Sequence, residues 1–391
     1  MDFRLTTTPE EEAFRKEVSD FLETELTDEL RRQHAMDKGL RAEARAFNRK
    51  IGEKGWLGLG WPEEYGGSGG SLRYEIILLQ EFARHEAHIP NEIARFMSGP
   101  TILHFGSEEM KKEFLPRIAK GEIEFGLGYT EPPAGSDLMA MQMRAVEEGD
   151  YYLINGQKTF NTESHYAEYH WLGAKTNPKG PRHQSMSLFV VDQRAPGITI
   201  RPLETLGGER TNEIFYDDVK VPKSRLVGEK NQGFLYMVSA LNYERLSLIQ
   251  MERFFPLLRR IIQYTKETRR NGVLLADDSL IRDRLAQMAI EIEVAKAIEY
   301  KALAMILEGR IPDYEAGIIK LIGSEMRQRL GYMGMDILGH FGLLEEGSHL
   351  AQLKGEIARI CRASVVDTIG GGTSEIIRNV TAMRGLGLPR K

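Results

Sequence analysis

The sequence predicts an α+β multidomain protein in which two helical domains flank a middle domain made of β-strands. With 391 residues, the chain is too long for one hydrophobic core. Apolar residues recur at helical spacing near both ends, whereas short β-rich runs edged by proline and glycine fill the middle. We therefore expect three domains, at 1–122, 123–230 and 231–391.

The N-terminal domain begins with a helix whose start is marked in the sequence. Thr8 and Glu11 have the spacing of a capping box, and Pro9 stands at the first helical position. Helical spacing then continues over three ranges: 40–54, 71–88 and 107–120. The glycine-rich run from Gly66 to Gly70 is predicted to form a turn.

Short runs of β-forming residues predict a small antiparallel barrel or sandwich in the middle domain. The runs are Tyr151–Ile154, Lys158–Thr162, Ser187–Val191, Ile198–Arg201 and Glu213–Val219. Asn155-Gly156, between the first two runs, is the dipeptide typical of a two-residue hairpin turn. We therefore expect a hairpin there.

Helical periodicity returns in the third domain and continues to the end of the chain. The expected helices cover 232–271, 278–308, 313–338, 347–366 and 374–384. Several are long enough to pack side by side as a bundle.

The composition and charge of the chain limit the kinds of partner that it binds. The 52 basic and 57 acidic residues give a net charge of -5, without a basic cluster. We therefore expect neither nucleic acid nor a membrane surface as a partner. Cys361 is the only cysteine, which excludes an intrachain disulfide. Nothing resembling a signal peptide opens the chain, and no apolar run reaches about 18 residues, so we expect a cytoplasmic protein.

A carboxylate lies on the apolar face of the first helix expected in the third domain. Glu244 falls within a stripe of apolar residues at steps of three and four: Met237, Leu241, Leu248, Met251 and Phe255. Burial raises the pKa of a carboxyl group, which makes it a suitable base for a weak carbon acid. Periodicity alone also fits an ion pair with Arg245 or with another helix, and such pairs outnumber catalytic carboxylates.

Two loops carry groups suited to ligand binding. In TEPPAGSD (Thr130–Asp137), prolines and a glycine fix an irregular backbone whose hydroxyl groups and amides suit the polar edge of a ring ligand. In IGGGTSEI (Ile369–Ile376), three glycines lead into a helix whose first backbone amides suit a carbonyl oxygen or a phosphate. Taken alone, the first is also an ordinary loop and the second an ordinary turn between helices.

Other nucleotide and metal motifs are missing from the sequence. It has no GxGxxG after a strand, no GxxxxGK and no HExxH, so a Rossmann site, a phosphate loop and a helical zinc site lack support. His165 and His170 are expected to be surface or packing residues rather than metal ligands. We therefore predict no metal site.

Over essentially its whole length, the chain resembles the acyl-CoA dehydrogenase family. The resemblance rests on the order of seven segments: Met1-Asp2-Phe3, YTEPPAGSD (Tyr129–Asp137), NGQKTFNT (Asn155–Thr162), FYDDVKVP (Phe215–Pro222), NQGF (Asn231–Phe234), ILGHFG (Ile337–Gly342) and GGTSEI (Gly371–Ile376). It implies the fold of that family: an N-terminal α-helical domain, a middle β-barrel domain and a C-terminal four-helix bundle. It also implies a homotetramer, or a heterotetramer with a related chain.

The resemblance implies FAD as the cofactor. Thr130 and Ser136 match positions that contact the edge of the flavin. Phe160 matches an aromatic residue that packs on the flavin ring system, and Thr162 lies near its reactive nitrogen. Three further implied contacts to FAD are Gly339, Thr373 and Glu375.

Two segments depart from the family pattern: one that reaches the FAD of a neighbouring subunit, and the final turn that contacts FAD. ETRRNG (Glu267–Gly272) has Asn271 where many relatives carry a phenylalanine, which leaves Arg269 or Arg270 as the implied contact. Asp336 and His340 stand where glutamine and glycine are commoner. The resemblance therefore implies different contacts on the adenine side.

The resemblance also identifies a catalytic base. Many relatives carry a glutamate where this chain has Gly371, but a minority branch that includes isovaleryl-CoA dehydrogenases takes the base from a pattern similar to NYER (Asn242–Arg245). Glu244 matches that base, in agreement with its place on the apolar stripe. The implied substrate contacts are Ser136, Tyr243, Arg245, Gly371 and Gly372.

The implied reaction is α,β-dehydrogenation of an acyl-CoA, with electrons passed to an electron-transferring flavoprotein. Three alternatives share the fold: a flavin oxidase or monooxygenase, an enoyl-CoA reductase, and a subunit of a heteromeric dehydrogenase. The small Gly371 would admit a branched, cyclic or aromatic acyl group. Arg84 and Arg95 lie in the segment that borders the acyl end in this family, so a dicarboxylic substrate is a further hypothesis beside the commoner role of an exposed arginine.

Overall fold

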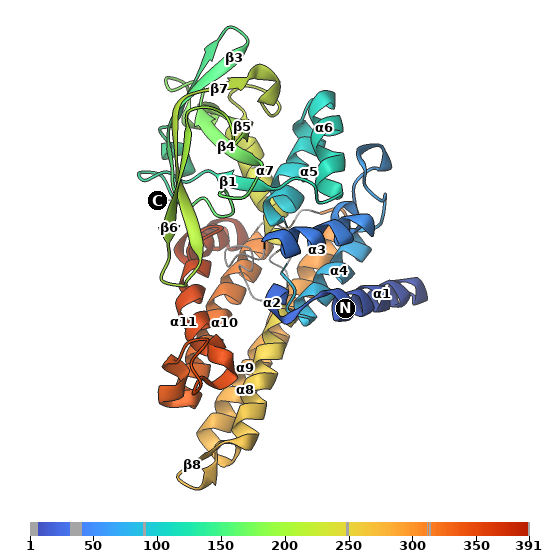
Figure 1. The fold of residues 1–391 in the computed structure, drawn as a ribbon, viewed down its shortest axis with the longest axis vertical. Helices are drawn as coiled ribbons and strands as arrows, with labels where there is room; N and C mark the ends of the chain where they lie inside the picture. The colour runs from blue at the N-terminus through green and yellow to red at the C-terminus, as the bar shows by residue number, and fades with distance from the viewer. Residues whose placement is uncertain are drawn as a thin grey trace.

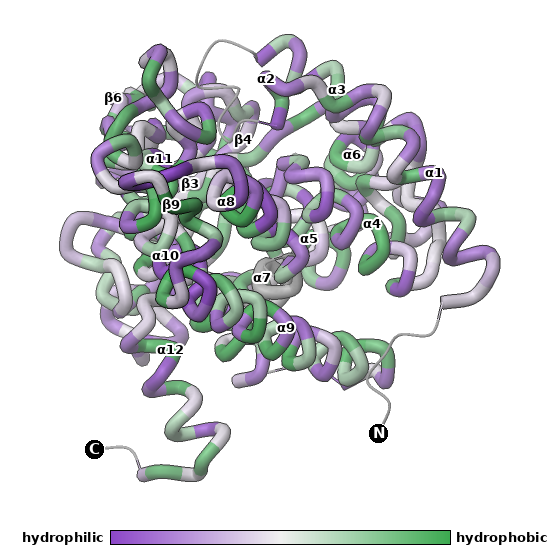
Figure 2. The backbone as a smooth tube through the Cα atoms, turned by 90° about the horizontal axis from the view of Figure 1, so that it is seen from below, coloured by the Kyte–Doolittle hydropathy of each residue, from purple (hydrophilic) through white to green (hydrophobic). Residues whose placement is uncertain are grey.

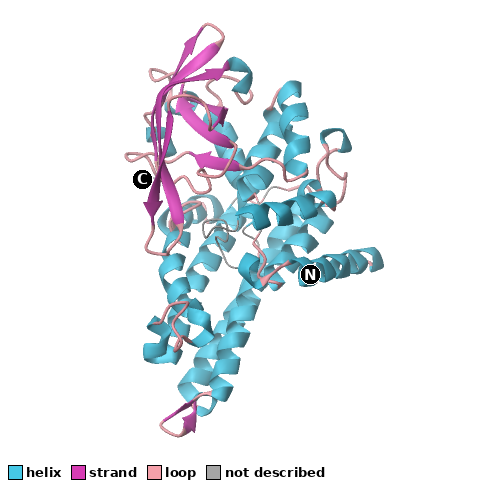
Figure 3. Ribbon diagram, viewed as in Figure 1, coloured by secondary structure: helices cyan, strands magenta, loops and turns pink. Residues whose placement is uncertain are grey.

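The computed structural model has helices at both ends of the chain and a curled β-sheet between them (Figure 1). The structure describes residues 7–31, 41–88, 91–247, 250–310, 312 and 314–389, with the side chains of 242–247 excepted. The predicted Met1-Asp2-Phe3 segment lies outside these residues. Apart from one short hairpin, the strands gather at one end of the long axis and helices make up the rest (Figure 3).

The first helix begins as its sequence predicts. Thr8 Oγ1 accepts the backbone N–H of Glu11, and the Glu11 carboxylate accepts the N–H of Thr8, which completes the capping box. The helices of this domain are α1 (Pro9–Glu25), α2 (Asp28–Arg31), α3 (Arg41–Glu53), α4 (Leu72–Arg84), α5 (Gly99–Phe105) and α6 (Glu108–Ala119), with a π-helical turn at Ile93–Ser98. The glycine-rich run 66–70 is a non-helical connection, as expected.

The middle of the chain forms one curled seven-stranded sheet. Its strands are β1 (Phe125–Gly128), β2 (Arg144–Glu148), β3 (Tyr151–Lys158), β4 (Tyr169–Lys175), β5 (Met186–Asp192), β6 (Ile198–Glu204) and β7 (Arg210–Pro222). They are arranged in the order β1-β4-β2-β3-β7-β6, and β5 also pairs with β4. Most neighbours are antiparallel, but β1 runs parallel to β4, which the prediction of an antiparallel sheet did not include.

The hairpin predicted at Asn155-Gly156 is wrong. Both residues lie inside β3, which continues to Lys158 and pairs with β7 on both sides of a register shift at this point. The Asn155 amide exchanges two hydrogen bonds of 2.9 Å with Asp218 of β7. Asn155 thus faces both Asp217 and Asp218, so the extra residue is a bulge in β7.

The third domain is a bundle of long helices. The elements are α7 (Gly233–Ser247), α8 (Phe254–Glu267), α9 (Ser279–Leu307), α10 (Tyr314–Leu338), α11 (Glu356–Asp367) and α12 (Ser374–Val380), with a hairpin of β8 (Arg269–Arg270) and β9 (Val273–Leu274) after α8. Figure 2 shows α12 and the residues after it projecting away from the rest of the molecule. Among the described residues, no helix has both the length and the apolar composition needed to cross a bilayer.

The single helix predicted over 232–271 is wrong in two places. Pro256 has no N–H to donate to the carbonyl of Glu252, so a continuous helix would lose a hydrogen bond there. The chain instead makes a 3₁₀ turn at Met251–Arg253 and restarts as α8. At the other end, Asn271 and Gly272 adopt positive φ angles and turn the β8–β9 hairpin. The helix predicted over 347–366 begins only at residue 356.

The start of α7 is fixed against the sheet by close backbone packing. Asn231 donates its N–H to Ser187 Oγ of β5 at 2.8 Å and accepts a hydrogen bond from Thr176 at 2.7 Å. A Cβ atom on Gly233 would lie 2.7 Å from the Ser187 backbone, closer than real Cβ contacts. Glycine at this position therefore lets α7 lie directly on β5.

We predict that Gly233→Ala destabilises the protein by about 1–3 kcal/mol, because the new methyl group forces α7 away from β5. The midpoint of thermal unfolding, measured by circular dichroism, should fall. Gly60→Ala is the matched control, since a Cβ at Gly60 meets no atom within 4 Å. Equal midpoints for the two variants would contradict the proposed contact.

Candidate functional site

A buried ion pair joins the TEPPAGSD loop to the end of β3. Lys158 is fully buried, and its Nζ lies 2.8 Å from Glu131 Oε1 while donating to the Tyr129 carbonyl at 3.0 Å. Burial lowers the pKa of Lys158 to about 8, and the Glu131 charge opposes that shift. Glu131 also accepts the N–H of Met143 at 3.1 Å. The loop is therefore fixed from inside the core.

This pair brings the two predicted flavin-contact segments together. The Thr130 carbonyl accepts the N–H of Thr159 at 3.0 Å, so Thr130 lies beside the backbone that leads to Phe160 and Thr162. Ser136 and Thr162 are both exposed. The two segments thus present hydroxyl groups and backbone on one side of the sheet.

Phe160 is held in an unusual conformation. Its φ is +56°, and 60% of its surface is exposed, although an apolar ring of this size gains free energy from burial. The next residue, Asn161, is buried, donates its side-chain amide to the Leu127 carbonyl at 2.6 Å and bonds through its backbone to Asn212. These bonds on Asn161 impose the strain on Phe160, and strained residues cluster at functional sites.

The exposed groups around Phe160 fit a planar ring ligand with a polar edge. Aromatic rings stack on one another with an offset, and an exposed phenylalanine offers such a surface. Thr130, Ser136 and Thr162 supply hydroxyl groups beside it, and a Cβ on Gly135 would meet no atom within 4 Å. The residues present therefore match the chemistry of a flavin ring.

The glycine loop before α12 forms a second part of the site. Gly371 and Gly372 have positive φ angles, and Lys320 of α10 donates to the Gly372 carbonyl at 2.5 Å. Among the described residues, a Cβ on Gly371 would find only the Lys320 side chain within 4 Å, at 3.9 Å, which leaves room beside the loop. Thr373 caps α12, and hydrogen bonding to the backbone and to Thr373 lowers the pKa of Glu375.

The helix that carries Glu244 lies in a core shared by all three parts of the chain. Met237 and Ala240 of α7 are buried with Met97 of the N-terminal domain and Leu188 of the sheet, and Leu241 packs against this cluster. The predicted site residues Tyr243, Glu244 and Arg245 follow on the same helix, but their side chains lie outside the described residues. Leu248 also lies outside them.

The turn after α7 is held by charged side chains from two other helices. Glu299 of α9 is buried and accepts the N–H of Met251 at 3.2 Å. Burial raises the pKa of Glu299 to about 7. The neighbouring Glu252 lies 3.1 Å from Lys296 of α9 and 3.5 Å from Arg84 of α4. These contacts fix the direction in which the chain leaves α7.

A cavity of about 1060 Å³ lies between the sheet, the end of α4 and the C-terminal helices. On the sheet side, Arg210 donates to Asn212 at 3.0 Å, and Asn212 donates to the carbonyl of Asn161, next to Phe160. On the helical side, Arg327 pairs with Asp367, the last residue of α11 before the glycine loop. Arg253, in the turn after α7, also lines it. Through these contacts the cavity lies near three predicted site segments, although none of their described residues lines it.

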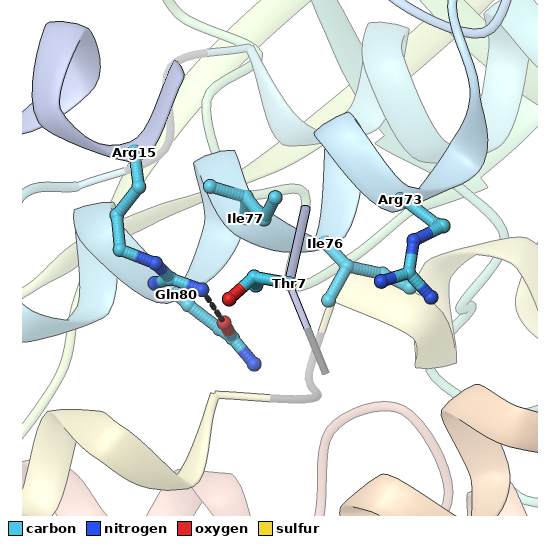
Figure 4. A pocket seen from close by; sticks show the side chains of 6 residues that line it. All are labelled: Thr7, Arg15, Arg73, Ile76, Ile77 and Gln80. Carbon is cyan, nitrogen blue, oxygen red and sulfur yellow. Dashed lines mark hydrogen bonds between the residues drawn. The ribbon is translucent and has the colours of Figure 1, made fainter. Parts of the chain in front are cut away.

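A pocket between the N-terminal helices is too small to hold a substrate. It lies between the start of the described chain, α1 and α4, and its volume is about 10 Å³, enough for about one water molecule. Figure 4 shows its lining, in which Arg15 donates to Gln80 at 3.1 Å. We assign this pocket to packing between the two helices.

Four of the predicted FAD contacts lie together, far from the Phe160 loop. Arg269 lies in the β8–β9 hairpin, at the opposite end of the long axis from β3 (Figure 1), and donates to the Gly272 carbonyl. Gly339 lies next to Arg270 of the same hairpin, whereas Asp336 pairs with Arg284 at 2.7 Å. His340 is exposed beside them. Within one chain, this group does not meet the Phe160 loop.

The two arginines predicted near the acyl end are bound within the protein. Arg84 pairs with Glu81 at 2.7 Å and with Glu252. Arg95 is buried and pairs with Glu75 at 2.6 Å, although its Nε and Nη1 have no hydrogen-bond partner among the described residues. Arg253 was missed, because no local pattern distinguishes a cavity arginine from a surface one.

The two histidines have packing environments. His170 is fully buried and stacks parallel to the ring of Tyr216, and burial lowers its pKa to about 3. His165 is partly buried, and its ring lies 3.1 Å from the Asn212 amide. Both therefore belong to the framework beneath the Phe160 loop.

Three family models for acyl-CoA dehydrogenases match the chain in order. The N-terminal domain model covers residues 8–122, the middle domain model 126–219 and the C-terminal domain model 231–386. Acyl-CoA dehydrogenase FadE26 of Mycobacterium tuberculosis is 35% identical over 99% of each chain.

Two solved structures share the fold along its whole length. The ChsE4–ChsE5 complex from Mycobacterium tuberculosis contains a chain with a TM-score of 0.90 and 35% identity, covering 99% of this chain and 100% of that one. The Tcur3481–Tcur3483 steroid ACAD has a TM-score of 0.90 and 32% identity, covering 100% of both chains.

We predict that Glu299 makes the protein less stable as the pH rises from about 4.5 to 7. The unfolded chain loses this proton near pH 4.5, while the folded chain keeps it to about pH 7, so stability is lost over that range. The total is about 3 kcal/mol at about 1.4 kcal/mol per pKa unit.

Glu299→Gln keeps an acceptor for the Met251 N–H and should remove this loss. Urea unfolding at pH 5 and pH 8 measures it, and the variant should exceed the parent in stability only at pH 8. The exposed Glu308→Gln serves as the control. A variant that is less stable than the parent at both pH values would contradict the raised pKa.

Proposed function

The chain belongs to the acyl-CoA dehydrogenase family and is an oxidoreductase that acts on the CH–CH bond of acyl-CoA, and from this premise we propose that Glu244 is its base and FAD its cofactor. One observation carries the assignment of the base. Glu244 is the only acidic residue of α7, a helix packed into the core shared by all three domains, and Gly371 leaves the alternative position without a carboxylate.

In the proposed reaction, Glu244 removes the proton from the carbon next to the thioester carbonyl. A carboxylate among apolar side chains binds a proton more readily than one in water, which suits this step. Backbone amides of the loop at Gly371 and Gly372 are suited to binding the thioester oxygen, and hydrogen bonds there make the adjacent C–H group more acidic. Tyr243 and Arg245 flank the base as proposed substrate contacts.

The exposed ring of Phe160 and the hydroxyl groups of Thr130, Ser136 and Thr162 are the proposed holders of the flavin. The flavin supplies the acceptor for the hydride that leaves the β-carbon. Thr373 and Glu375 are further proposed contacts near the glycine loop. An electron-transferring flavoprotein is the proposed acceptor of the electrons, by analogy with the family.

Two features of the chain support assembly with further subunits. Arg269, Asp336, Gly339 and His340 lie far from the Phe160 loop, so they can contact a flavin only in a neighbouring subunit. Large apolar side chains are also exposed on the C-terminal domain: Leu280, Ile290, Val294, Val365, Val366, Ile369, Leu386 and Leu388. Exposed apolar side chains that gather on one face mark protein interfaces, and Ile290 and Val294 lie four residues apart on α9. A tetramer of identical chains, or of two related chains, is the proposed assembly.

The cavity and the small residue at Gly371 support a bulky acyl group. A volume of about 1060 Å³ is slightly above the range of about 300–1,000 Å³ for small-molecule sites. A relative with the same fold is a steroid ACAD. A branched or polycyclic acyl-CoA is therefore the proposed substrate class.

Anaerobic titration of the purified protein with straight, branched, polycyclic and dicarboxylic acyl-CoAs tests this function directly. A substrate should bleach the flavin absorbance. Rapid return of the colour on admitting air would favour an oxidase instead. Bleaching by none of these thioesters, together with reoxidation by an enoyl-CoA, would favour a reductase.

We predict that Glu244→Gln lowers turnover by about 10²- to 10⁴-fold, the range typical of a lost general base. Flavin content, read from the absorbance of the purified protein, should be unchanged. Steady-state turnover with the thioester that bleaches the parent measures the loss. Glu308→Gln, at the exposed end of α9, is the control. Near-normal turnover of the Glu244→Gln protein would contradict the assignment.

We predict that Val294→Glu shifts the protein toward smaller assemblies. Val294 and Ile290 are 55% and 56% exposed and lie four residues apart on one face of α9, so a charge there would enter the proposed interface. Sedimentation velocity measures the change. Lys301→Glu introduces the same charge on α9 at an exposed polar position and should leave the assembly intact. An unchanged assembly in both variants would exclude this face.

A further inference from the structure

We propose that Arg253 binds a second anionic group, a carboxylate, on the acyl chain of the substrate. This inference deepens the proposed function and depends on it. In this proposal, the cavity between the sheet, the end of α4 and the C-terminal helices binds the end of the acyl chain that carries the carboxylate.

Arg253 differs from the other arginines of the cavity in its contacts. Arg260 is held by Glu86 at 2.6 Å and by Glu356 at 2.9 Å, and Arg327 is held by Asp367 at 2.6 Å. Arg253 is exposed in the cavity, and its guanidinium makes neither a hydrogen bond nor an ion pair with any residue that the structure describes. Among the described residues, none accepts from its five N–H donors, which suit an anionic ligand.

Glu252, the nearest carboxylate in the sequence, does not form an ion pair with Arg253. Glu252 is buried on the other side of the same turn, where Lys296 and Arg84 bind it. Glu299 accepts the N–H of Met251 and fixes the turn further. The turn is thus held from the α9 side, while Arg253 points to the cavity.

The surroundings of Arg253 favour an anion. The cavity is accessible to solvent but enclosed by protein on several sides, and this desolvation lowers the pKa of Arg253. The positive charge of Arg327 lowers it further, against the opposing effects of Glu92, Asp367 and Glu86. Desolvation also lowers the pKa of Arg359, which faces the same cavity. A ligand carboxylate would relieve this repulsion and bond to a guanidinium.

The geometry of α10 sets the length of the expected ligand. Lys320 contacts the glycine loop at Gly372, and Arg327 lies seven residues further along the same helix. Seven residues of α-helix span about 10 Å. A carboxylate near Arg253 and Arg327 would then lie on the order of 10 Å from a thioester at the glycine loop. Long dicarboxylic acyl-CoAs and ring systems that bear a carboxylate meet this requirement.

The same guanidinium chemistry also suits a phosphate of the flavin cofactor. The flavin phosphate and the substrate carboxylate can be told apart by the property that changes when Arg253 is replaced. A flavin phosphate contact would make cofactor retention depend on it, whereas a substrate contact would affect only thioesters that carry the second anion.

The test compares acyl-CoAs of equal length with and without a terminal carboxylate, using holoenzyme of the parent, Arg253→Gln and Arg253→Lys. Calorimetric titration gives the affinity for each thioester. Arg253→Gln should weaken binding of the carboxylated thioester by about 10- to 100-fold, as expected for one charge-assisted contact, and leave the plain thioester unchanged. Arg253→Lys, which keeps the charge, should lose less.

Arg259→Gln is the matched control, because Arg259 is exposed on α8, which begins directly after Arg253, but does not line the cavity. Equal weakening of both thioesters, or of neither, would overturn the proposal, and so would loss of flavin from Arg253→Gln. Flavin bleaching is recorded separately with the plain thioesters. If these bind but do not bleach the parent, the proposed dehydrogenation fails, while the affinity comparison still decides the role of Arg253.

Discussion

The proposed flavin site depends on one buried ion pair, Lys158 with Glu131. Two charges removed from water are costly unless they are paired and fully hydrogen-bonded, and here the pair also binds the Tyr129 carbonyl and the Met143 N–H. The pair therefore joins the loop after β1, the start of β2 and the end of β3 at one point. Phe160 follows two residues after Lys158, so the position of its exposed ring is set by a contact inside the core.

The helix of the proposed base is fixed in a comparable way at both of its ends. At its start, Gly233 lies against Ser187 of β5, and in the turn that follows α7, Met251 is bound by Glu299 of α9. The sheet thus holds the start of α7, and the C-terminal bundle holds the turn after it. A base needs to lie within hydrogen-bond reach of the proton that it removes. Because α7 is held between two domains, the position of the base depends on how those domains pack.

The sequence predicted features that depend on neighbouring residues and missed those that depend on distant ones. The capping box at Thr8 and the order of helical and β regions follow from local patterns, and both are confirmed. The hairpin at Asn155-Gly156 failed because Asp218 of β7 binds the Asn155 amide and keeps β3 continuous. Arg253 was missed because its cavity is assembled from elements far apart in the chain. The role of Glu244 was inferred from periodicity and resemblance, and it stays a prediction.

The arrangement of charges separates recognition of the acyl chain from the chemistry at the thioester. Arg84, Arg95 and Arg260 each bind carboxylates of the protein, so their charges serve contacts between helices. Arg253 forms no ion pair with a carboxylate among the described residues, and it lies in a turn outside α7. Changing it would alter the preferred acyl group without moving Glu244 or the glycine loop. The proposed base lies on α7, and Arg253 lies in the turn after it. The preferred substrate can therefore change while the reaction stays the same.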